Sequence, residues 1–403
     1  MSTAAVSTPP TAVPTTDEAF AHARGAIHRA AADLWPGAEA RLDRHVPSVT
    51  GYVQRLHIDD RELYAKYSFL GMSLVSLLRG AGGDWAEVQR AQSTYVRATD
   101  ALLEREAAQL RLLGELGRPQ VCQIAGVGGG VLFTEPVAGT TLDQLLLQNP
   151  ADSPALFERV FTELHRLHIS RTAERLAASR TIAERSVAGT FQRKFNGISG
   201  QTYLGRLGTE RCTPDERAEV TALLRAVVAR LLRIRPTALA PGQAVLTYGD
   251  LKPEHLVFPT PDARPVLIDP GLLRARSSAD AAKLISRTIL LIAAQQPDPA
   301  TAHTIADGIG AFTEQRMTAM APKAARSWLR EVLILWLMDT VNILTTYLSA
   351  PAALPLPERG HALVDRAVTV ATLAHSISAE LLGGRDTTTV WHTALAQAKA
   401  ARA

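Results

Sequence analysis

The chain has 403 residues, of which 46% are apolar and 20% charged, with a formal charge of +4 and a pI near 9.2. This length and apolar content can bury a large core, which excludes wholesale disorder and favours two lobes over one small domain. The arginines are scattered along helical patterns rather than gathered in one basic block, so we expect no nucleic-acid partner.

The cysteine pattern and the lack of a recognisable targeting segment predict a cytoplasmic protein. The two cysteines, Cys122 and Cys212, lack CxxC or Cys/His spacing, which predicts neither a disulfide framework nor a structural zinc site. Residues 1–17 have no continuous apolar segment typical of a secretory signal, so we expect a flexible tail there. The apolar stretch at 328–348 contains charged residues such as Glu331 and Asp339, and therefore predicts a buried core helix without a membrane partner.

The first part of the chain predicts helices around a small sheet. Residues 18–42 have helical spacing of Ala, Leu and Trp. Residues 46–70 alternate between apolar and polar positions around Asp59 and Asp60, which predicts a hairpin or meander ending in a strand that contains Lys66. A loop with three glycines at 80–83 then leads to a helix over 102–116.

The rest of the chain is mainly helical on either side of one unusual segment. Residues 118–146 predict two strands around a glycine turn at 128–130, then a helix opened by Thr141 or Asp143. Helical patterns fill 155–240 and 279–403, with an interruption at 351–360. Between them lies YGDLKPEHLVFPTPDARPVLIDPG, which begins at Tyr248. It gathers carboxylates, a lysine and a histidine around an apolar strand, as a site for phosphate and a metal ion requires.

This element order, with these residues, resembles the protein-kinase-like fold, and specifically the aminoglycoside phosphotransferase and choline kinase branch. The resemblance covers about residues 45–350 and is most specific at 132–145 and 246–271. It implies a bilobal α+β fold. Residues 18–137 would form an N-terminal extension and a small β-rich, nucleotide-binding N-lobe, and residues 138–403 a helical C-lobe with the catalytic loop and the acceptor site. ATP and Mg²⁺ are the implied cofactors.

The resemblance also assigns roles to individual residues around the phosphate. Asp250 matches the catalytic-loop aspartate that orients or deprotonates the acceptor hydroxyl, and Asp269 matches the strand-end aspartate that holds magnesium. Lys66 would contact the α and β phosphates and pair with a glutamate of the next helix. Glu106 is the expected partner, and Glu104 is the alternative.

Two further segments would hold the rest of the nucleotide. Residues 132–139 resemble the hinge between lobes, where backbone groups near Glu135 and Val137 would bind adenine. The loop that covers the nucleotide would lie near Gly51, although it has no GxGxxG pattern. His165 and His168 match a family helix, and we expect them to be core or capping residues rather than ligands.

Two residues depart from the family pattern. Tyr248 stands where the family generally has histidine, which affects loop packing more than chemistry. His255 stands where the family usually has a metal-binding asparagine, and magnesium prefers oxygen ligands. His255 is then either a tolerated ligand or a neighbouring group in an active kinase, or the protein is a pseudokinase that binds nucleotide or peptide without turnover. Retention of Lys66, Asp250 and Asp269 favours the active enzyme.

The acceptor is left open between two classes. Residues 151–245 contain 15 Arg and Lys against 9 Asp and Glu, so they offer no acidic site for a polycationic aminoglycoside. One candidate is a hydroxyl of a natural product or metabolite. The other is Ser or Thr of an acidic peptide, because Lys252 in DLKPE matches a lysine that contacts the γ-phosphate in protein kinases. Such an enzyme would activate a ribosomal precursor peptide for dehydration in lanthipeptide or thioamitide biosynthesis.

Overall fold

The computed structural model describes residues 13–169, 182, 184, 186–238 and 244–400, so residues 1–12 of the tail expected at 1–17 lie outside the described residues. The expected tail is wrong at Thr16 and Asp17, which begin a helix capped by Thr15. The chain forms two compact units. Unit 1 comprises Met1–Glu104, Ala125–Thr134 and Pro351–Pro355, and unit 2 comprises Arg105–Ile124, Glu135–Ala350 and Leu356–Ala403. The predicted lobe boundary at 137 stays a prediction, while the chain passes from unit 1 to unit 2 between Thr134 and Glu135.

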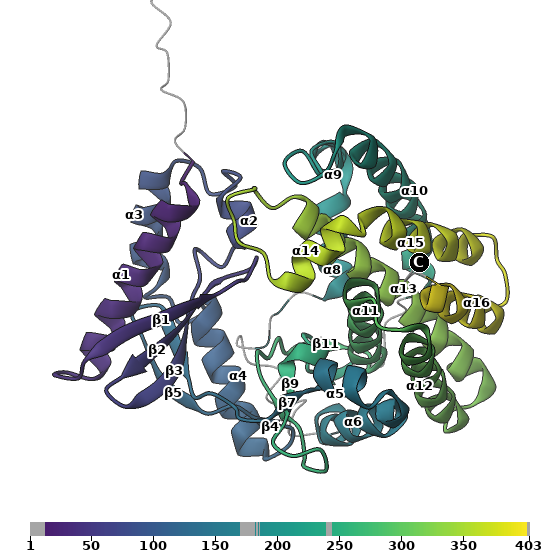
Figure 1. The fold of residues 1–403 in the computed structure, drawn as a ribbon, viewed down its shortest axis with the longest axis horizontal. Coiled ribbons are helices and arrows are strands. Elements are labelled where there is room, and N and C mark those ends of the chain that lie inside the picture. The colour runs from purple at the N-terminus through teal and green to yellow at the C-terminus, as the bar shows by residue number, and fades with distance from the viewer. Residues whose placement is uncertain (1–12, 170–181, 183, 185, 239–243, 401–403) are drawn as a thin grey trace, which may run out of the picture. The chain divides into compact units, whose positions relative to one another are not determined.

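Unit 1 is built on a five-stranded sheet with strand order β1-β2-β3-β6-β5. The strands are β1 (Ala40–Val46), β2 (Tyr52–Ile58), β3 (Arg61–Tyr67), β5 (Ile124–Gly128) and β6 (Val131–Thr134). Helix α1 (Thr16–Leu34) packs on one face of this sheet (Figure 1). The helical pattern expected over 18–42 is therefore wrong beyond Leu34. Pro36 disfavours helical backbone in the residue before it, and Gly37 turns the chain at φ 85° into β1.

The predicted hairpin or meander, which ends in a strand that contains Lys66, is confirmed. The turn between β2 and β3 is formed at Asp59, which has φ 51°, and Val53 of β2 and Leu132 of β6 lie opposite Lys66 of β3. Alternate residues of β3, including Ala65 and Tyr67, are buried, whereas Lys66 is half-buried on the other face. The period of two in the sequence therefore fixed which side of the sheet carries the lysine.

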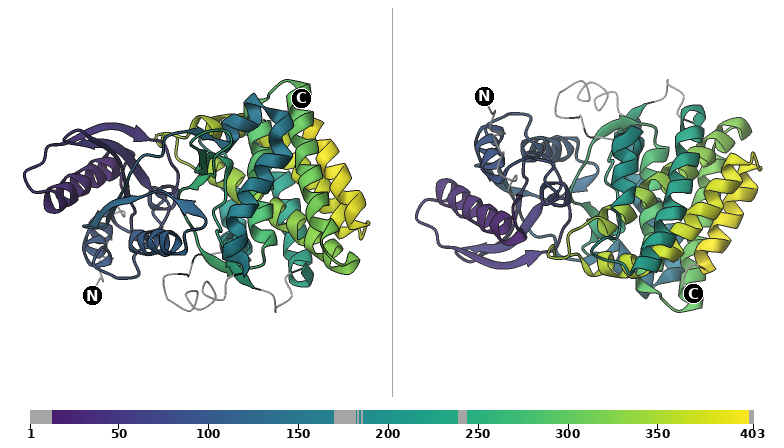
Figure 2. Two further views of the ribbon diagram at one scale, coloured as in Figure 1. Left: turned by 90° about the horizontal axis from the view of Figure 1, so that it is seen from below. Right: turned by 90° about the horizontal axis from the view of Figure 1, so that it is seen from above.

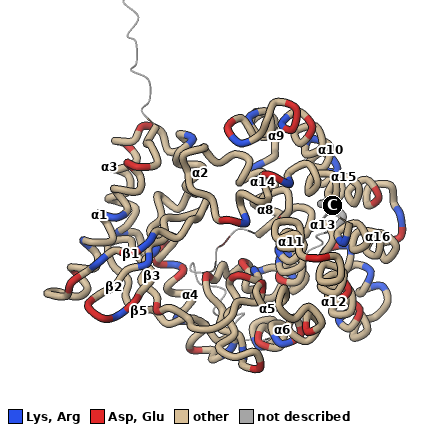
Figure 3. The backbone as a smooth tube through the Cα atoms, viewed as in Figure 1, with Lys and Arg blue, Asp and Glu red and all other residues tan. Residues whose placement is uncertain are grey.

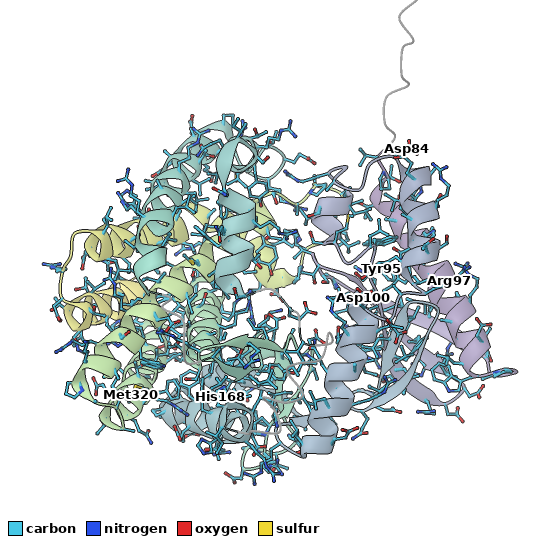
Figure 4. All side chains as sticks on the ribbon, turned by 180° about the vertical axis from the view of Figure 1, so that it is seen from behind. Asp84, Tyr95, Arg97, Asp100, His168 and Met320 are labelled. Atoms are coloured by element: carbon cyan, nitrogen blue, oxygen red, sulfur yellow. The ribbon has the colours of Figure 1, made fainter. Side chains whose placement is uncertain are left out.

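Three helices follow β3. They are α2 (Leu74–Leu77), α3 (Trp85–Tyr95) and α4 (Leu102–Leu116). Helix α4 confirms the expected helix at 102–116, but α3 lies in a stretch for which the sequence analysis predicted no element. Its signal is the cap, because the Asp84 side chain accepts a hydrogen bond of 2.8 Å from the Ala86 amide (Figure 4).

Unit 2 carries two small sheets of short, largely buried strands. One has the order β4-β10-β9-β7, and the other pairs β8 with β11. The strands are β4 (Gln120–Val121), β7 (Thr140–Thr141), β8 (Val245–Thr247), β9 (Leu256–Phe258), β10 (Val266–Leu267) and β11 (Leu273–Ala275). The short turns η1 (Pro150–Asp152) and η2 (Pro253–His255) are 3₁₀-helical. Helix α5 (Leu142–Gln148) begins after Thr141, as predicted.

The remaining helices of unit 2 confirm the helical patterns at 155–240 and 279–403 within the described residues. They are α6 (Ser153–Ile169), α8 (Val187–Phe195), α9 (Gly197–Gly205), α10 (Pro214–Ala238), α11 (Ser278–Gln295), α12 (Pro299–Thr318), α13 (Pro322–Leu348), α14 (Glu358–Asp365), α15 (Ala367–Leu382) and α16 (Thr387–Ala400). Helix α11 packs against α13, and α10 against α15 (Figure 2). Helix α14 begins at Glu358, so the interruption expected at 351–360 ends three residues early.

Helix α13 is the core helix that the sequence predicts at 328–348. Among the described residues it is the one helix long and apolar enough to cross a membrane, but 83% of its most apolar window is buried inside the protein. Lys, Arg, Asp and Glu are scattered among uncharged residues along the chain (Figure 3). Helix α13 is mostly buried from Trp328 onward, and its two acidic residues, Glu331 and Asp339, pair with Arg276 and Lys283.

Candidate active site

Two loops of unit 2 lie side by side and carry the central residues. We name residues 248–255 the catalytic loop and residues 268–272 the metal loop. The Gly271 amide donates a hydrogen bond of 3.1 Å to the Tyr248 carbonyl, and the Ile268 amide donates one of 3.0 Å to the His255 carbonyl. Strands β8 and β11, which flank the loops, pair with each other. The two loops are therefore joined at both ends, and Asp250 and Asp269 belong to adjacent segments.

Backbone conformation at two positions shows how tightly the loops fit. Gly249 has φ 80°, and a Cβ atom there would lie 2.1 Å from the Gly271 carbonyl oxygen, so only glycine allows the approach. Asp269 has φ 57°, a left-handed conformation that a non-glycine residue adopts at a cost of about 1–2 kcal/mol. Strain retained at a carboxylate is typical of a functional position.

The carboxylate of Asp250 is held by two lysines, one on each oxygen. The Lys252 Nζ atom lies 2.6 Å from Oδ2, and the Lys283 Nζ atom lies 3.3 Å from Oδ1. Burial by itself would raise the pKa of Asp250, but the two ammonium groups outweigh it and hold this pKa well below its usual range. The carboxylate is therefore ionised at neutral pH.

Lys283 belongs to a buried ionic cluster between α11 and α13. Its Nζ atom lies 2.8 Å from Oδ1 of Asp339, and the Arg287 Nε atom lies 2.7 Å from Oδ2 of the same carboxylate. Burial raises the pKa of Asp339, but Arg287 and Lys283 outweigh it and lower this pKa to about 2. Sequence analysis missed these three residues. Their signal was two cations four positions apart in an apolar helix, where an unpaired charge is costly.

Asp280 fixes the backbone of the catalytic loop. Its side chain is fully buried and accepts hydrogen bonds from the amides of Tyr248, at 3.0 Å, and Gly249, at 2.8 Å. The His168 Nε2 atom lies 3.0 Å from the same carboxylate (Figure 4). This agrees with the structural role expected for His168, whereas His165 is exposed and the core or capping role expected for it is wrong. Asp280 itself was not predicted.

Tyr248 and Gln109 connect the two loops to their surroundings. The Tyr248 hydroxyl donates a hydrogen bond of 2.8 Å to the Ile268 carbonyl, so this ring joins the catalytic loop to the metal loop. Burial raises the pKa of Tyr248 well above its ordinary value, which keeps the phenol neutral. The buried Gln109 side chain of α4 accepts a hydrogen bond of 2.9 Å from the Leu272 amide.

His255 faces the metal loop. Its Nε2 atom lies 3.5 Å from Oδ2 of Asp269, and its buried Nδ1 atom has no hydrogen-bond partner among the described residues. Burial and the nearby Lys252 lower the pKa of His255, so the imidazole is neutral at neutral pH. A neutral imidazole can bind a metal ion or donate a hydrogen bond to Asp269.

The donor set fits a magnesium ion that is shared with a bound phosphate. Within the part of the chain that the structure describes, no three His, Cys, Asp or Glu side chains form a closed metal cage. Magnesium in nucleotide sites is usually held by one or two protein groups together with phosphate oxygens and water. Asp269 supplies such a group, and His255 lies beside it as a poorer one.

A clamp from the C-terminal helices holds η2. The Arg359 guanidinium of α14 lies 2.7 Å from the Glu254 carboxylate and also pairs with Asp143 at the start of α5. Burial raises the pKa of Glu254, but Arg359 outweighs it and lowers this pKa to about 2. Arg359 was not singled out in the sequence, because α14 follows the predicted motifs by about a hundred residues.

The predicted nucleotide residues are divided between the units. Lys66 and Gly51 lie in unit 1, whereas Glu106, Glu135 and Val137 lie in unit 2. The pairing of Lys66 with Glu106, the adenine contacts at 135–137 and the cover at Gly51 stay predictions. Glu106 lies one turn before Gln109 on α4, on the face that reaches the metal loop.

Comparisons with known proteins agree with this arrangement. The model of a phosphotransferase enzyme family matches residues 82–319, more than half of the chain. Comparison with curated proteins found no match. A microcompartment-associated aminopropanol kinase is similar over 90% of this chain and 98% of its own, at 15% identity and a TM-score of 0.51.

Two further solved structures are similar to this chain at lower TM-scores. A choline kinase from Streptococcus pneumoniae covers 87% of this chain and 99% of its own, at 15% identity and a TM-score of 0.44. A Plasmodium vivax ethanolamine kinase covers 78% and 77%, at 12% identity and a TM-score of 0.44. The family match confirms the resemblance seen in the sequence and, with the aminopropanol kinase, the α+β protein-kinase-like fold.

Proposed function

The chain belongs to the phosphotransferase enzyme family, and we propose that it moves the γ-phosphate of ATP, with Mg²⁺, to a hydroxyl group of an acceptor that is not an aminoglycoside. Its enzyme class, a phosphotransferase with an alcohol group as acceptor, is the one expected from the sequence. One observation carries the proposal. The ionised Asp250 lies in the loop next to Asp269, with a lysine on each carboxylate oxygen.

Asp250 orients the acceptor hydroxyl. Phosphoryl transfer passes through a loose transition state, in which positioning and charge matter more than early removal of the hydroxyl proton. A carboxylate whose pKa is held well below its usual range is a weak base but a strong hydrogen-bond acceptor. It therefore aligns the hydroxyl oxygen with the phosphorus and takes the proton only as the new P–O bond forms.

Lys252 and the metal loop provide the positive charge around the phosphate. Lys252 contacts Oδ2 of Asp250 and has 18% of its side chain accessible, so it can turn to a phosphate oxygen while the hydroxyl binds Oδ2. Asp269 holds Mg²⁺, with His255 as its neighbour or second ligand. The ion, when bound, neutralises charge on the transferring phosphoryl group.

The nucleotide is held, in this proposal, by the residues expected from the sequence. Lys66 contacts the α and β phosphates and is oriented by Glu106, backbone groups near Glu135 and Val137 bind adenine, and the loop at Gly51 covers the phosphates. The half-buried position of Lys66 on a regular strand supports this role, because a lysine held there has little freedom to relocate.

The acceptor is a neutral or anionic hydroxyl compound. Residues 151–245 contain 15 basic and 9 acidic residues, and this net positive charge disfavours the binding of a polycationic acceptor. A hydroxylated natural product or metabolite and a Ser or Thr of an acidic peptide both satisfy this condition. The DLKPE sequence at 250–254 supports the peptide, which would be a ribosomal precursor activated for dehydration in lanthipeptide or thioamitide biosynthesis, and the hydroxylated metabolite fits the basic segment equally well.

The decisive experiment measures transfer from [γ-³²P]ATP with Mg²⁺ to a panel that contains an aminoglycoside, neutral polyols and acidic Ser/Thr peptides. Asp250→Ala removes the orienting carboxylate, and Asp262→Ala is the matched control, because Asp262 lies in the same segment with 99% of its side chain exposed. We expect transfer that Asp250→Ala abolishes and Asp262→Ala retains. Transfer that survives Asp250→Ala would contradict the proposal.

A pseudokinase is the second candidate, and His255 is the observation that favours it. An imidazole in place of an amide oxygen weakens a magnesium site. Titration of the purified chain with a fluorescent ATP analogue, with and without Mg²⁺, separates the two. Binding that is indifferent to Mg²⁺, with no transfer to any member of the panel even in His255→Asn, would establish the pseudokinase.

A further inference from the structure

Helix α11 contacts the catalytic loop at two points, and the two contacts act on different parts of it. Asp280 accepts hydrogen bonds from the backbone amides of Tyr248 and Gly249. Lys283, three residues later and on the same helix face, contacts the Asp250 side chain. One residue of α11 thus fixes the path of the loop, and the other fixes the direction of its carboxylate.

The charge balance shows that Lys283 is not needed to neutralise its other partner. Arg287 already makes two hydrogen bonds to Asp339, from Nε at 2.7 Å and from Nη2 at 3.4 Å. Only 2% of the Asp339 side chain and 11% of the Lys283 side chain are exposed. A second buried cation beside Asp339 is therefore costly unless it also contacts another anion. The cluster of Lys283, Arg287 and Asp339 has a net charge of +1. Its contact with a further anion is the one between the Lys283 ammonium group and Oδ1 of Asp250.

The two lysines on Asp250 differ in what they can do during a reaction. Lys252 belongs to the loop itself and has the more exposed side chain, 18% against 11% for Lys283. Lys283 stands on a buried helix, and Asp339 on α13 holds its ammonium group at 2.8 Å. When Lys252 turns to a phosphate oxygen, Asp250 loses one of its two partners, but the contact with Lys283 remains.

We propose that Lys283 is a positioning residue, anchored by Asp339, that holds Oδ1 of Asp250 and so presents Oδ2 to the acceptor hydroxyl throughout the transfer. The inference rests on the proposed function for its catalytic meaning, but the positioning itself is a property of the unliganded chain. A reacting group displaced by about 1 Å can lose about a hundredfold in rate, so loss of this contact affects turnover more than nucleotide binding.

The first test is structural and needs no acceptor. Crystal structures of the wild type, Lys283→Met and Arg276→Met are compared at the side chain of Asp250. Arg276→Met is the matched control, because Arg276 lies just before α11 and forms a similar ion pair of 3.1 Å to the buried Glu331 of α13. We expect Asp250 to leave its rotamer in Lys283→Met alone. An unmoved Asp250 in Lys283→Met overturns the proposal.

The second test is kinetic and uses the acceptor from the transfer panel or, without one, Asp250-dependent hydrolysis of MgATP. We expect kcat to fall about 10- to 100-fold in Lys283→Met, with the KM for MgATP nearly unchanged and partial recovery in Lys283→Arg. A role in folding alone would lower kcat equally in Arg276→Met and in proportion to the loss of thermal stability. That result would overturn the inference.

The two tests separate the inference from the proposed function. If Asp250 moves in the Lys283→Met crystal but the wild type never shows Asp250-dependent turnover, the positioning role stands and the proposed activity fails. In the opposite case, the wild type is active and Asp250→Ala is inactive, but Lys283→Met has the wild-type kcat and the wild-type rotamer of Asp250. The proposed activity then stands and the positioning role fails.

Discussion

The two units carry their candidate site residues on different kinds of structure. In unit 1, Lys66 stands on the regular strand β3, with neighbouring strands on both sides in fixed register. In unit 2, Asp250 and Asp269 stand on irregular loops, whose position depends on side chains from α11 and α14. Regular strands satisfy their own backbone groups, whereas loops need partners from elsewhere in the chain.

This difference teaches where each region is vulnerable. Lys66 keeps its place as long as the sheet forms, because register alone decides its face. Asp250 keeps its place only while Asp280 and Lys283 are present, and neither belongs to the catalytic loop. Activity should therefore respond to buried polar residues of the helices in unit 2, whereas exposed ion pairs of the sheet in unit 1 should matter little.

The largest expected effect is on activity, at the strained carboxylate. Asp269→Asn keeps the shape of the side chain but removes the charge that holds Mg²⁺, so we expect kcat/KM to fall by about 10² to 10⁴. Asparagine tolerates the left-handed conformation found at φ 57°, so thermal stability should stay the same or rise slightly. Transfer assays and thermal unfolding measure the two quantities. Full activity in Asp269→Asn would contradict the metal role.

The next effect is on stability, at the buried carboxylate of α11. Asp280→Ala leaves the amides of Tyr248 and Gly249 without their acceptor, and each buried amide so orphaned costs about 1–3 kcal/mol. We expect a loss of about 2–5 kcal/mol in the free energy of unfolding, measured with urea. Asp280→Asn retains one acceptor oxygen and should lose less. Equal losses in the two variants would show that these hydrogen bonds are not the cause.

A smaller effect is the pH dependence that the Arg359 clamp confers. The pKa of Glu254 is about 2 in the folded chain against an ordinary value of 4.5. A lowered pKa contributes stability that is fully present above about pH 4.5 and is lost as the pH falls toward 2. Because a third of the Glu254 side chain is exposed, solvent reduces this contribution to about 1–2 kcal/mol.

Thermal unfolding from pH 7 to pH 3 tests the clamp. The wild type should lose stability below about pH 4.5, and Arg359→Met should be less stable at pH 7 but flatter over the acid range. Identical slopes for the two proteins would mean that Glu254 does not depend on Arg359.

The smallest effect is expected on the sheet of unit 1. Arg55 of β2 lies 2.6 Å from Glu62 and 3.2 Å from Asp43, and all three side chains are partly exposed. Arg55→Met should therefore cost about 1 kcal/mol or less. The same change at Arg287, whose side chain is 7% exposed and pairs with Asp339, should cost about 3–5 kcal/mol. Similar losses in the free energy of unfolding at Arg55 and Arg287 would contradict the expected difference between the two units.

Local patterns made much of the fold predictable. The alternation in β2 and β3 and the apolar spacing of α4 correspond to elements that form largely from neighbouring residues. The prediction failed where a short local signal decided the outcome. Pro36 and Gly37 ended the first helix earlier than its apolar spacing suggested, and the Asp84 cap began a helix in which only Val88 and Gln92 are buried.

The candidate site was predictable only for residues that carry a motif. Asp250, Lys252, His255 and Asp269 lie within twenty residues, so their spacing could be compared with a known pattern. Lys283, Asp339 and Arg359 belong to no such motif. Their apolar helices indicate that Lys283 and Asp339 are buried, but nothing in the sequence connects either residue, or Arg359, with the catalytic loop.

The sequence by itself determined the class of this protein, because hydrophobic periodicity and the chemistry of a short motif are properties of neighbouring residues. Only the tertiary structure decided what holds the reacting carboxylate. The ammonium group of Lys283 reaches Asp250 because α11 and α13 pack together and bury Asp339 between them. Asp250, Lys283 and Asp339 are far apart in the sequence and come into contact only when the helices pack and exclude water. In that environment the attraction between opposite charges is stronger, which holds the side chains in one orientation.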